Sequence, residues 1–182
     1  MPSRFPMASR LLHWTMAAMV LAMLFIGIAM VGSLADYHRL VAIHRPLGIL
    51  ILVLVALRLA NRLIRPGPPL PSDMPGILRF AAHASHALLY TLMVALPLVG
   101  WTMLSAAGNP IVLIGAWHLP PLLPPSDALY ALLRPLHTVL AFVLFATFLV
   151  HLGAALMHAL IFRDGVFQSM VSWNTPSRKM RA

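Results

Sequence analysis

Residues 133–162 have the sequence LRPLHTVLAFVLFATFLVHLGAALMHALIF, and this stretch decides the fold. It is apolar almost throughout, and its one cationic residue, Arg134, stands near its start. An α-helix needs about 20 consecutive apolar residues to cross the hydrocarbon core of a bilayer. We therefore predict a transmembrane helix here, with His137, His151 and His158 along it.

Three similar apolar runs precede this stretch, at about residues 11–32, 41–64 and 80–106. The third contains Pro97, where we expect a kink. Segments that favour turns lie between the runs: residues 32–36, the proline-rich stretch 65–75, and residues 108–134 with their five prolines. Residues 1–182 are thus predicted to form one all-α domain, an integral membrane four-helix bundle with antiparallel neighbours.

The composition supports this prediction, because 60% of the 182 residues are hydrophobic, only 9% are charged and the mean hydropathy is +0.87. Most soluble folds and a large extramembrane domain are excluded. Membrane topology and anionic lipid headgroups account for the net charge of +9, so we expect membrane lipid and no nucleic acid as a partner. Because the sequence has no cysteine, any redox cofactor must be held by histidine or methionine.

The basic residues are distributed unevenly between the two sides of the predicted bundle. Ten fall on the side of the termini, and three, Arg39, Arg45 and Arg134, fall on the other. Short loops rich in Lys and Arg stay in the cytoplasm, so both termini are predicted to be cytoplasmic. The opening MPSRFPMASR lacks the small-residue cleavage site of a signal peptide, so we expect the first span to be retained.

Histidines inside the spans are the candidate ligands. His137 and His151 are 14 residues apart, which places them within about 40° of one helical face and about 21 Å apart along the axis. That separation is too long for one metal ion and suits two haems at different depths. By depth, His44 at the outer end of the second span pairs with His137, and His13 near the inner end of the first span pairs with His151.

A buried histidine can also be a hydrogen-bonded packing residue, although burial in lipid makes an unpartnered one costly. Four histidines at matched depths, with no acidic residue in the core, favour haem over zinc or a transporter. We therefore predict two b-type haems whose irons are held by His13, His44, His137 and His151.

Three arginines lie near the predicted ligands in the sequence. Arg45 follows His44, and Arg134 is three residues before His137, so both are candidates to contact the propionates of the outer haem. Arg10 is the candidate for the inner haem. Each side chain could instead extend to the membrane interface without contacting a cofactor.

Over nearly its whole length the sequence resembles the bacterial cytochrome b561 family of di-haem membrane proteins. The likeness rests on these stretches: Arg10-Leu11-Leu12-His13-Trp14, His44 with Gly48, His83-Ala84-Ser85-His86, Pro97 to Gly100, the three histidines of the fourth span, and Arg163-Asp164-Gly165. The family's pattern implies the same four axial ligands. We accordingly expect a multi-pass protein of the bacterial inner membrane.

The resemblance implies superoxide:ubiquinone oxidoreductase activity, in which periplasmic superoxide reduces the outer haem and ubiquinone is reduced at the inner one. A quinone needs an apolar slot with a few polar groups. The candidates for such a site lie at the inner end: Arg79, His83, His86 and His158. Hydrogen bonding among interfacial side chains is the other explanation for them. The outer segments carry Asp36 and Asp127 against three arginines, so they offer little net charge to attract an anion.

Two other functions stay open from the sequence. The chain could be a cytochrome subunit that relays electrons between a partner dehydrogenase or hydrogenase and quinone, although its short loops offer little docking surface. It could also be a transporter or structural membrane protein without haem. The paired absorption bands of low-spin haem in the purified protein would exclude this last possibility.

Overall fold

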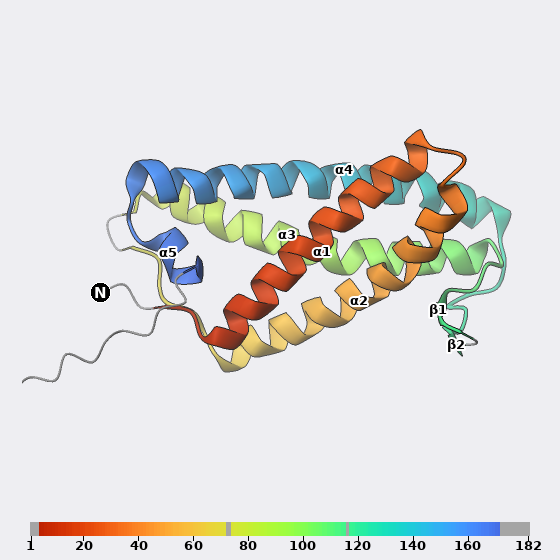
Figure 1. The fold of residues 1–182 in the computed structure, drawn as a ribbon, viewed down its shortest axis with the longest axis horizontal. Coiled ribbons are helices and arrows are strands. Elements are labelled where there is room, and N and C mark those ends of the chain that lie inside the picture. Colours follow the sequence, from red (N-terminus) through yellow and green to blue (C-terminus); the bar gives the residue numbers. More distant parts are fainter. Residues whose placement is uncertain (1–3, 72–73, 116, 172–182) are drawn as a thin grey trace, which may run out of the picture.

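The computed structural model describes residues 4–71, 74–115 and 117–171. Four long helices dominate this part of the chain (Figure 1): α1, Met7–Gly32; α2, Tyr37–Ile64; α3, Gly76–Ala106; and α4, Asp127–Met157, which continues as the π-helix η1, His158–Phe162. All four are long and apolar enough to cross a membrane. The predicted all-α membrane bundle of four helices is therefore confirmed.

The helices begin earlier than the apolar runs predicted. Helices α1, α2 and α3 each start four residues before the predicted boundary, and α4 starts six residues before it, at Asp127. Ser126 caps α4, because its Oγ accepts a hydrogen bond from the backbone N–H of Leu129 at 3.4 Å. The loop predicted over residues 108–134 was thus wrong for residues 127–134, where the charges of Asp127 and Arg134 lowered the local hydropathy and hid a helix start.

Three of the long helices continue through an internal proline: Pro46 in α2, Pro97 in α3 and Pro135 in α4. A proline removes one backbone hydrogen bond and leaves a carbonyl without its usual donor. Membrane helices tolerate this because neighbouring helices and side chains can satisfy the freed carbonyl.

The bundle alternates in direction. Helix α1 packs along α2, α3 packs along α4, and α2 also contacts α3. In Figure 1 the α1–α2 turn and the α3–α4 connection lie at one end, while the start of α1 and the short helix α5, Val166–Val171, lie at the other. A backbone hydrogen bond of 3.2 Å from Phe5 to Ser169 ties the start of the chain to α5. The cytoplasmic location of this second end stays a prediction.

The interior of the bundle is small. Its buried cluster draws on all four helices: Val20, Ile51, Leu92, Leu96 and Leu144. In the most apolar 18-residue stretch of each long helix, only 6% to 11% of the residues are buried inside the protein. Large apolar side chains cover the outside instead, among them Phe142 and Val150, which are both 67% exposed. Lipid covers such an apolar surface where the four helices lie in the membrane.

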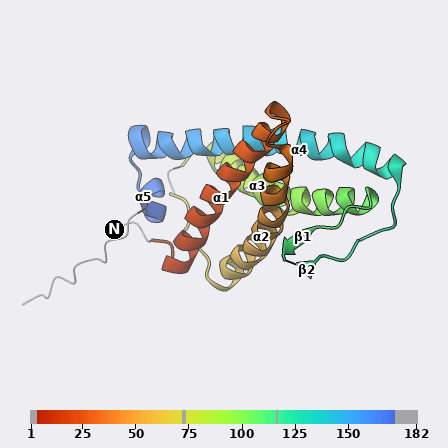
Figure 2. The same ribbon diagram turned by 45° about the vertical axis from the view of Figure 1, so that its right-hand side comes forward.

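The connection between α3 and α4 contains a short hairpin that the sequence analysis did not predict. Strands β1, Val112–Ile114, and β2, Trp117–His118, pair antiparallel, and Figure 2 shows them beside α2. The connection is tied to α3, because the backbone N–H of Ser126 donates to the carbonyl of Ala106 at 2.8 Å and that of Leu122 to the Oγ of Ser105 at 3.0 Å. The prolines of this segment concealed its strands, since they favour turns.

The topology can be tested with single cysteines, because the natural chain has none. Leu34 in the α1–α2 turn and Ile64 at the end of α2 are 91% and 77% exposed. We expect a membrane-impermeant maleimide to label Leu34→Cys in intact spheroplasts, and to label Ile64→Cys only after permeabilisation. The cysteine-free parent protein gives the background, and the reverse labelling pattern would show that the termini face the periplasm.

Candidate functional site

The structure brings His44 and His137 together at the end of the bundle that holds the α1–α2 turn. His44 lies on α2 and His137 on α4, with ring centroids 6.2 Å apart and planes inclined by 67°. The Nδ1 atoms of both rings are buried, and that of His44 has no hydrogen-bond partner among the described residues. The Nδ1 of His137 lies near the backbone of Leu96 but forms no hydrogen bond of ordinary geometry. The Nδ1 atoms therefore do not fix these rings through hydrogen bonds of ordinary geometry to the described residues.

Gly100 on α3 leaves room beside this pair. A Cβ atom at this position would lie 3.3 Å from Cε1 of His137 and 3.6 Å from its Nδ1. The first of these contacts is tighter than ordinary van der Waals packing and the second is ordinary, so a side chain here would press on the edge of the imidazole ring. By contrast, a Cβ at Gly153 on α4 would meet nothing within 4 Å.

A second group of histidines forms toward the opposite end. His13 of α1 and His151 of α4 have ring centroids 6.4 Å apart and planes inclined by 72°. His86 of α3 is closer to the same ring, with a centroid distance of 5.4 Å from His151. The two pairs predicted from depth are thus neighbours in space, and the structure adds His86 to the second of them.

The two predicted pairs share a spacing that suits one metal ion between two rings. Because metal–imidazole bonds are about 2 Å long, rings on opposite sides of one ion have centroids roughly 6 Å apart. The distances of 6.2 and 6.4 Å match this value, whereas 5.4 Å between His86 and His151 is too short. Within the described part of the chain, no group of three or more His, Cys, Asp or Glu could hold a metal ion. An ion between either pair would need its remaining ligands from outside those side chains, as the ring nitrogens of a macrocycle could supply.

The three arginines predicted near the ligands have different surroundings. Arg45 is half-buried and within electrostatic range of His44, whereas Arg134 is exposed on α4. Neither forms a side-chain hydrogen bond or ion pair with a described residue, so both guanidinium groups are available to an anionic partner. Arg10 is 7% exposed, and its Nη2 lies 3.7 Å from the sulfur of Met7.

The residues predicted for a quinone site occupy different surroundings at the end that holds α5. Arg79 is exposed and donates to the carbonyl of Pro71 at 3.4 Å, and His83 is also exposed. His86 packs against His151, as described above. His158 forms an ion pair with Asp164, whose Oδ2 is 2.6 Å from the histidine Nδ1. His158 therefore combines partial burial with a fixed orientation.

Sequence reasoning assigned no site role to Arg58, which the structure places among the inner histidines. Its Nε donates to the hydroxyl of Tyr90 at 2.9 Å, and its guanidinium carbon is 5.9 Å from the centre of that ring. It also lies within electrostatic range of His13, His86 and His151. A cation inside an apolar run is costly and so indicates a functional role. That signal could have identified Arg58 from the sequence.

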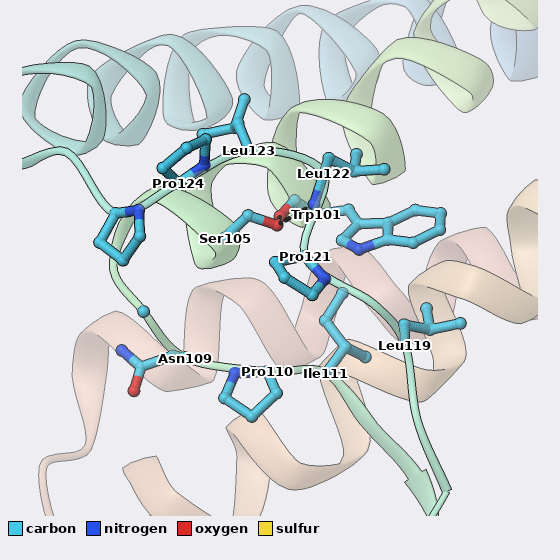
Figure 3. A pocket seen from close by; sticks show the side chains of 12 residues that line it. Trp101, Ser105, Asn109, Pro110, Ile111, Leu119, Pro121, Leu122, Leu123 and Pro124 are labelled. Carbon is cyan, nitrogen blue, oxygen red and sulfur yellow. Dashed lines mark hydrogen bonds between the residues drawn. The ribbon is translucent and has the colours of Figure 1, made fainter.

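A cavity lies apart from both histidine pairs, between the end of α3 and the proline-rich connection (Figure 3). Its volume is about 530 Å³ and its walls are mainly apolar. Ser105 has its hydroxyl engaged, because it donates to the carbonyl of Trp101 and accepts from the backbone of Leu122. The cavity therefore offers few polar groups to a ligand.

Comparison with known proteins finds relatives along almost the whole chain. Residues 4–173 match the family model described as prokaryotic cytochrome b561. Cytochrome b561 homolog 2 of Escherichia coli (strain K12) is 33% identical over 174 residues, which are 93% of this chain and 92% of the relative. Cytochrome b561 homolog 1 of the same organism is 28% identical over 181 residues, which are 97% of this chain and 99% of the relative. The "Probable superoxide oxidase CybB" of Yersinia pestis is 32% identical over 130 residues, which are 71% of this chain and 73% of the relative.

Proposed function

Because the chain belongs to the prokaryotic cytochrome b561 family, we propose that it carries two b-type haems and transfers electrons from periplasmic superoxide to ubiquinone in the bacterial inner membrane. Membership of the family makes it a bacterial multi-pass membrane protein that binds b-type haem and transfers electrons. The number of haems, the two substrates and the choice of membrane are what the proposal adds. One observation carries the proposal: two histidine pairs of similar spacing, His44–His137 and His13–His151, each have one member on α4.

In this proposal His44 and His137 hold the outer haem, and His13 and His151 hold the inner one. The centroid spacings support this assignment, and for the outer pair so do the buried Nδ1 atoms of His44 and His137, which lack the hydrogen bonds of ordinary geometry that packing histidines would make among the described residues. Haem b, when bound, supplies reversible one-electron transfer at its iron. Two imidazoles would hold each iron, and the apolar helices around them would keep water from it.

The arginines near each pair are suited to neutralise haem propionates. Arg45 and Arg134 serve the outer haem in this proposal, and neither has another side-chain partner among the described residues. At the inner haem Arg10 is joined by Arg58, which lies within electrostatic range of His13 and His151. Each guanidinium can donate paired hydrogen bonds to a carboxylate, which holds the macrocycle in one orientation.

The proposed reaction moves electrons from the outer end of the bundle to the inner end. Two superoxide anions each lose one electron and leave as O₂. One ubiquinone takes both electrons and two protons and becomes ubiquinol. Support for this direction comes from the relative in Yersinia pestis that is named as a probable superoxide oxidase. We place quinone reduction near His158 and His86, with Arg79 and His83 at the entrance, because His86 contacts the ring of His151.

The activity can be tested with the purified, fully haem-loaded protein in detergent. We expect superoxide and a soluble ubiquinone analogue to yield ubiquinol and O₂, with about two superoxide anions consumed per quinol, without another protein. Heat-inactivated protein provides the control. Failure of wild-type protein would contradict superoxide oxidation, and co-purification of a stoichiometric dehydrogenase or hydrogenase would establish the subunit function instead.

The ligand assignment can be tested by removing one histidine from each pair. We expect His44→Ala and His151→Ala each to lower the haem content to about half of the wild-type value, because each removes an axial ligand of one haem. His38→Ala is the matched control, since His38 is exposed at the start of α2. Pyridine haemochrome spectra measure the content. Full haem content in both variants would show that these histidines are not ligands.

The space at Gly100 provides an independent test of the outer haem. We expect Gly100→Leu to lose about half of the bound haem, because a side chain there presses on His137. Gly153→Leu is the control, since a Cβ at Gly153 meets no atom within 4 Å. The measurements are haem content and the reduced-minus-oxidised spectrum. Equal haem loss in the two variants would indicate a general packing effect.

A further inference from the structure

The turn after α4 has an unusual backbone. Residues 158–162 form the π-helix η1, and the backbone N–H of Arg163 donates to the carbonyl of His158 at 2.9 Å, a spacing of five residues. Arg163 itself has a φ of 51°, a left-handed conformation that non-glycine residues rarely adopt. The chain then reverses at Gly165, which has a φ of 84°. Single-turn π-helices occur frequently at functional sites. This turn brings Asp164 back to His158.

Both carboxylate oxygens of Asp164 are engaged. Oδ2 lies 2.6 Å from Nδ1 of His158, and Oδ1 accepts a hydrogen bond from the backbone N–H of Val166 at 3.1 Å. Val166 is the first residue of α5, which is held against α1 because Nε1 of Trp14 donates to the carbonyl of Met170 at 3.2 Å. The carboxylate is thus fixed by the backbone rather than by another mobile side chain.

The histidine is held as firmly as its partner. The side chain of His158 is only 14% exposed, and its ring packs edge-on against Phe162 at a centroid distance of 5.2 Å. With Nδ1 donating to the carboxylate, Nε2 is the nitrogen left for another partner. Among the described residues none hydrogen-bonds to it. His158 follows His151 by seven residues, which places it about 10 Å further along the same helical face.

We propose that Asp164 is a positioning residue, which orients His158 so that its Nε2 delivers a proton to the quinone oxygen. This inference rests on the proposed function, because it assumes that quinone is reduced at the end of the bundle that holds His151. The carboxylate accepts the Nδ1 hydrogen bond, selects the orientation of the ring and stabilises its protonated form. Asp164 itself does not contact the substrate.

The proton and electron balance is simple. Ubiquinone accepts two electrons that originate from two superoxide anions, or from a reduced partner protein. One of its oxygens takes the proton from Nε2 of His158, and the other takes a proton from cytoplasmic water. The same water then reprotonates Nε2, which is feasible because the ion pair lies at the surface, where the Asp164 side chain is 24% exposed.

The test follows quinone reduction from the inner side alone. Chemically reduced, haem-loaded protein is mixed with a soluble ubiquinone analogue, and reoxidation is followed by its absorbance. We expect Asp164→Ala to lower kcat for the quinone about tenfold or more, with little change in KM, because proton delivery and not binding is impaired. Asp164→Glu should recover part of the rate. Asp36→Ala is the matched control, since Asp36 also caps a turn, accepting from Ser33 at 2.9 Å, at the opposite end.

A double variant separates positioning from a general structural effect. If Asp164 acts through His158, Asp164→Ala should slow reoxidation no further in a His158→Gln background. The ¹⁵N spectrum of the reduced, diamagnetic protein, recorded at a pH where the His158 ring is neutral, gives a second readout. We expect the Nδ1–H tautomer in wild type and a mixture of tautomers in Asp164→Ala.

Each outcome has a distinct meaning. Wild-type protein that quinone cannot reoxidise would overturn the proposed function, while the tautomer measurement would still test the orientation of His158. Normal rates in Asp164→Ala, an additive loss in the double variant, or an unchanged tautomer would each overturn the role of Asp164. Haem content and thermal midpoint equal to wild type are required of each variant, and Asp164→Asn replaces Asp164→Ala if the latter fails to fold.

Discussion

Inside the hydrocarbon core no water is present to hydrogen-bond a free polar group, and the rest of this structure depends on that constraint. The backbone satisfies it by forming four long helices that continue even through their internal prolines. Side chains satisfy it by being apolar wherever they face lipid. The candidate ligand histidines meet one another in the bundle rather than facing lipid singly, and Arg58 lies among the inner group.

Helix α4 organises both histidine pairs, because it carries one member of each. His137 meets a histidine of α2 and His151 meets one of α1, while α3 contributes the space at Gly100 and the ring of His86. One straight element thus sets the distance between the two proposed haems, about 21 Å along its axis. A rigid helix is suited to this task, since electron transfer between two centres requires a fixed separation.

The two ends of the bundle are built differently. At the α1–α2 end the α3–α4 connection is tied to the helices by backbone hydrogen bonds and by Ser105, and its cavity has mainly apolar walls. At the α5 end the chain gathers arginines, tyrosine and the His158–Asp164 ion pair. The α5 end therefore holds an acid–base pair, His158 and Asp164, just beyond the helix that carries His151, which fits a reaction that consumes protons on that side.

Much of this could be predicted from the sequence. Apolar runs of membrane length identified the four helices, and the spacing of 14 residues put His137 and His151 on one face, because helical periodicity and bilayer thickness are fixed by local geometry. Tertiary structure alone decided the rest. It brought His86 to His151, Arg58 to Tyr90 and Gly100 to His137. It also began α4 at Asp127 and folded Asp164 back onto His158. The contacts between helices depend on how the helices rotate and cross one another. The start of α4 and the turn at Asp164 depend on a helix cap and on unusual backbone angles. A pattern of apolar residues encodes neither.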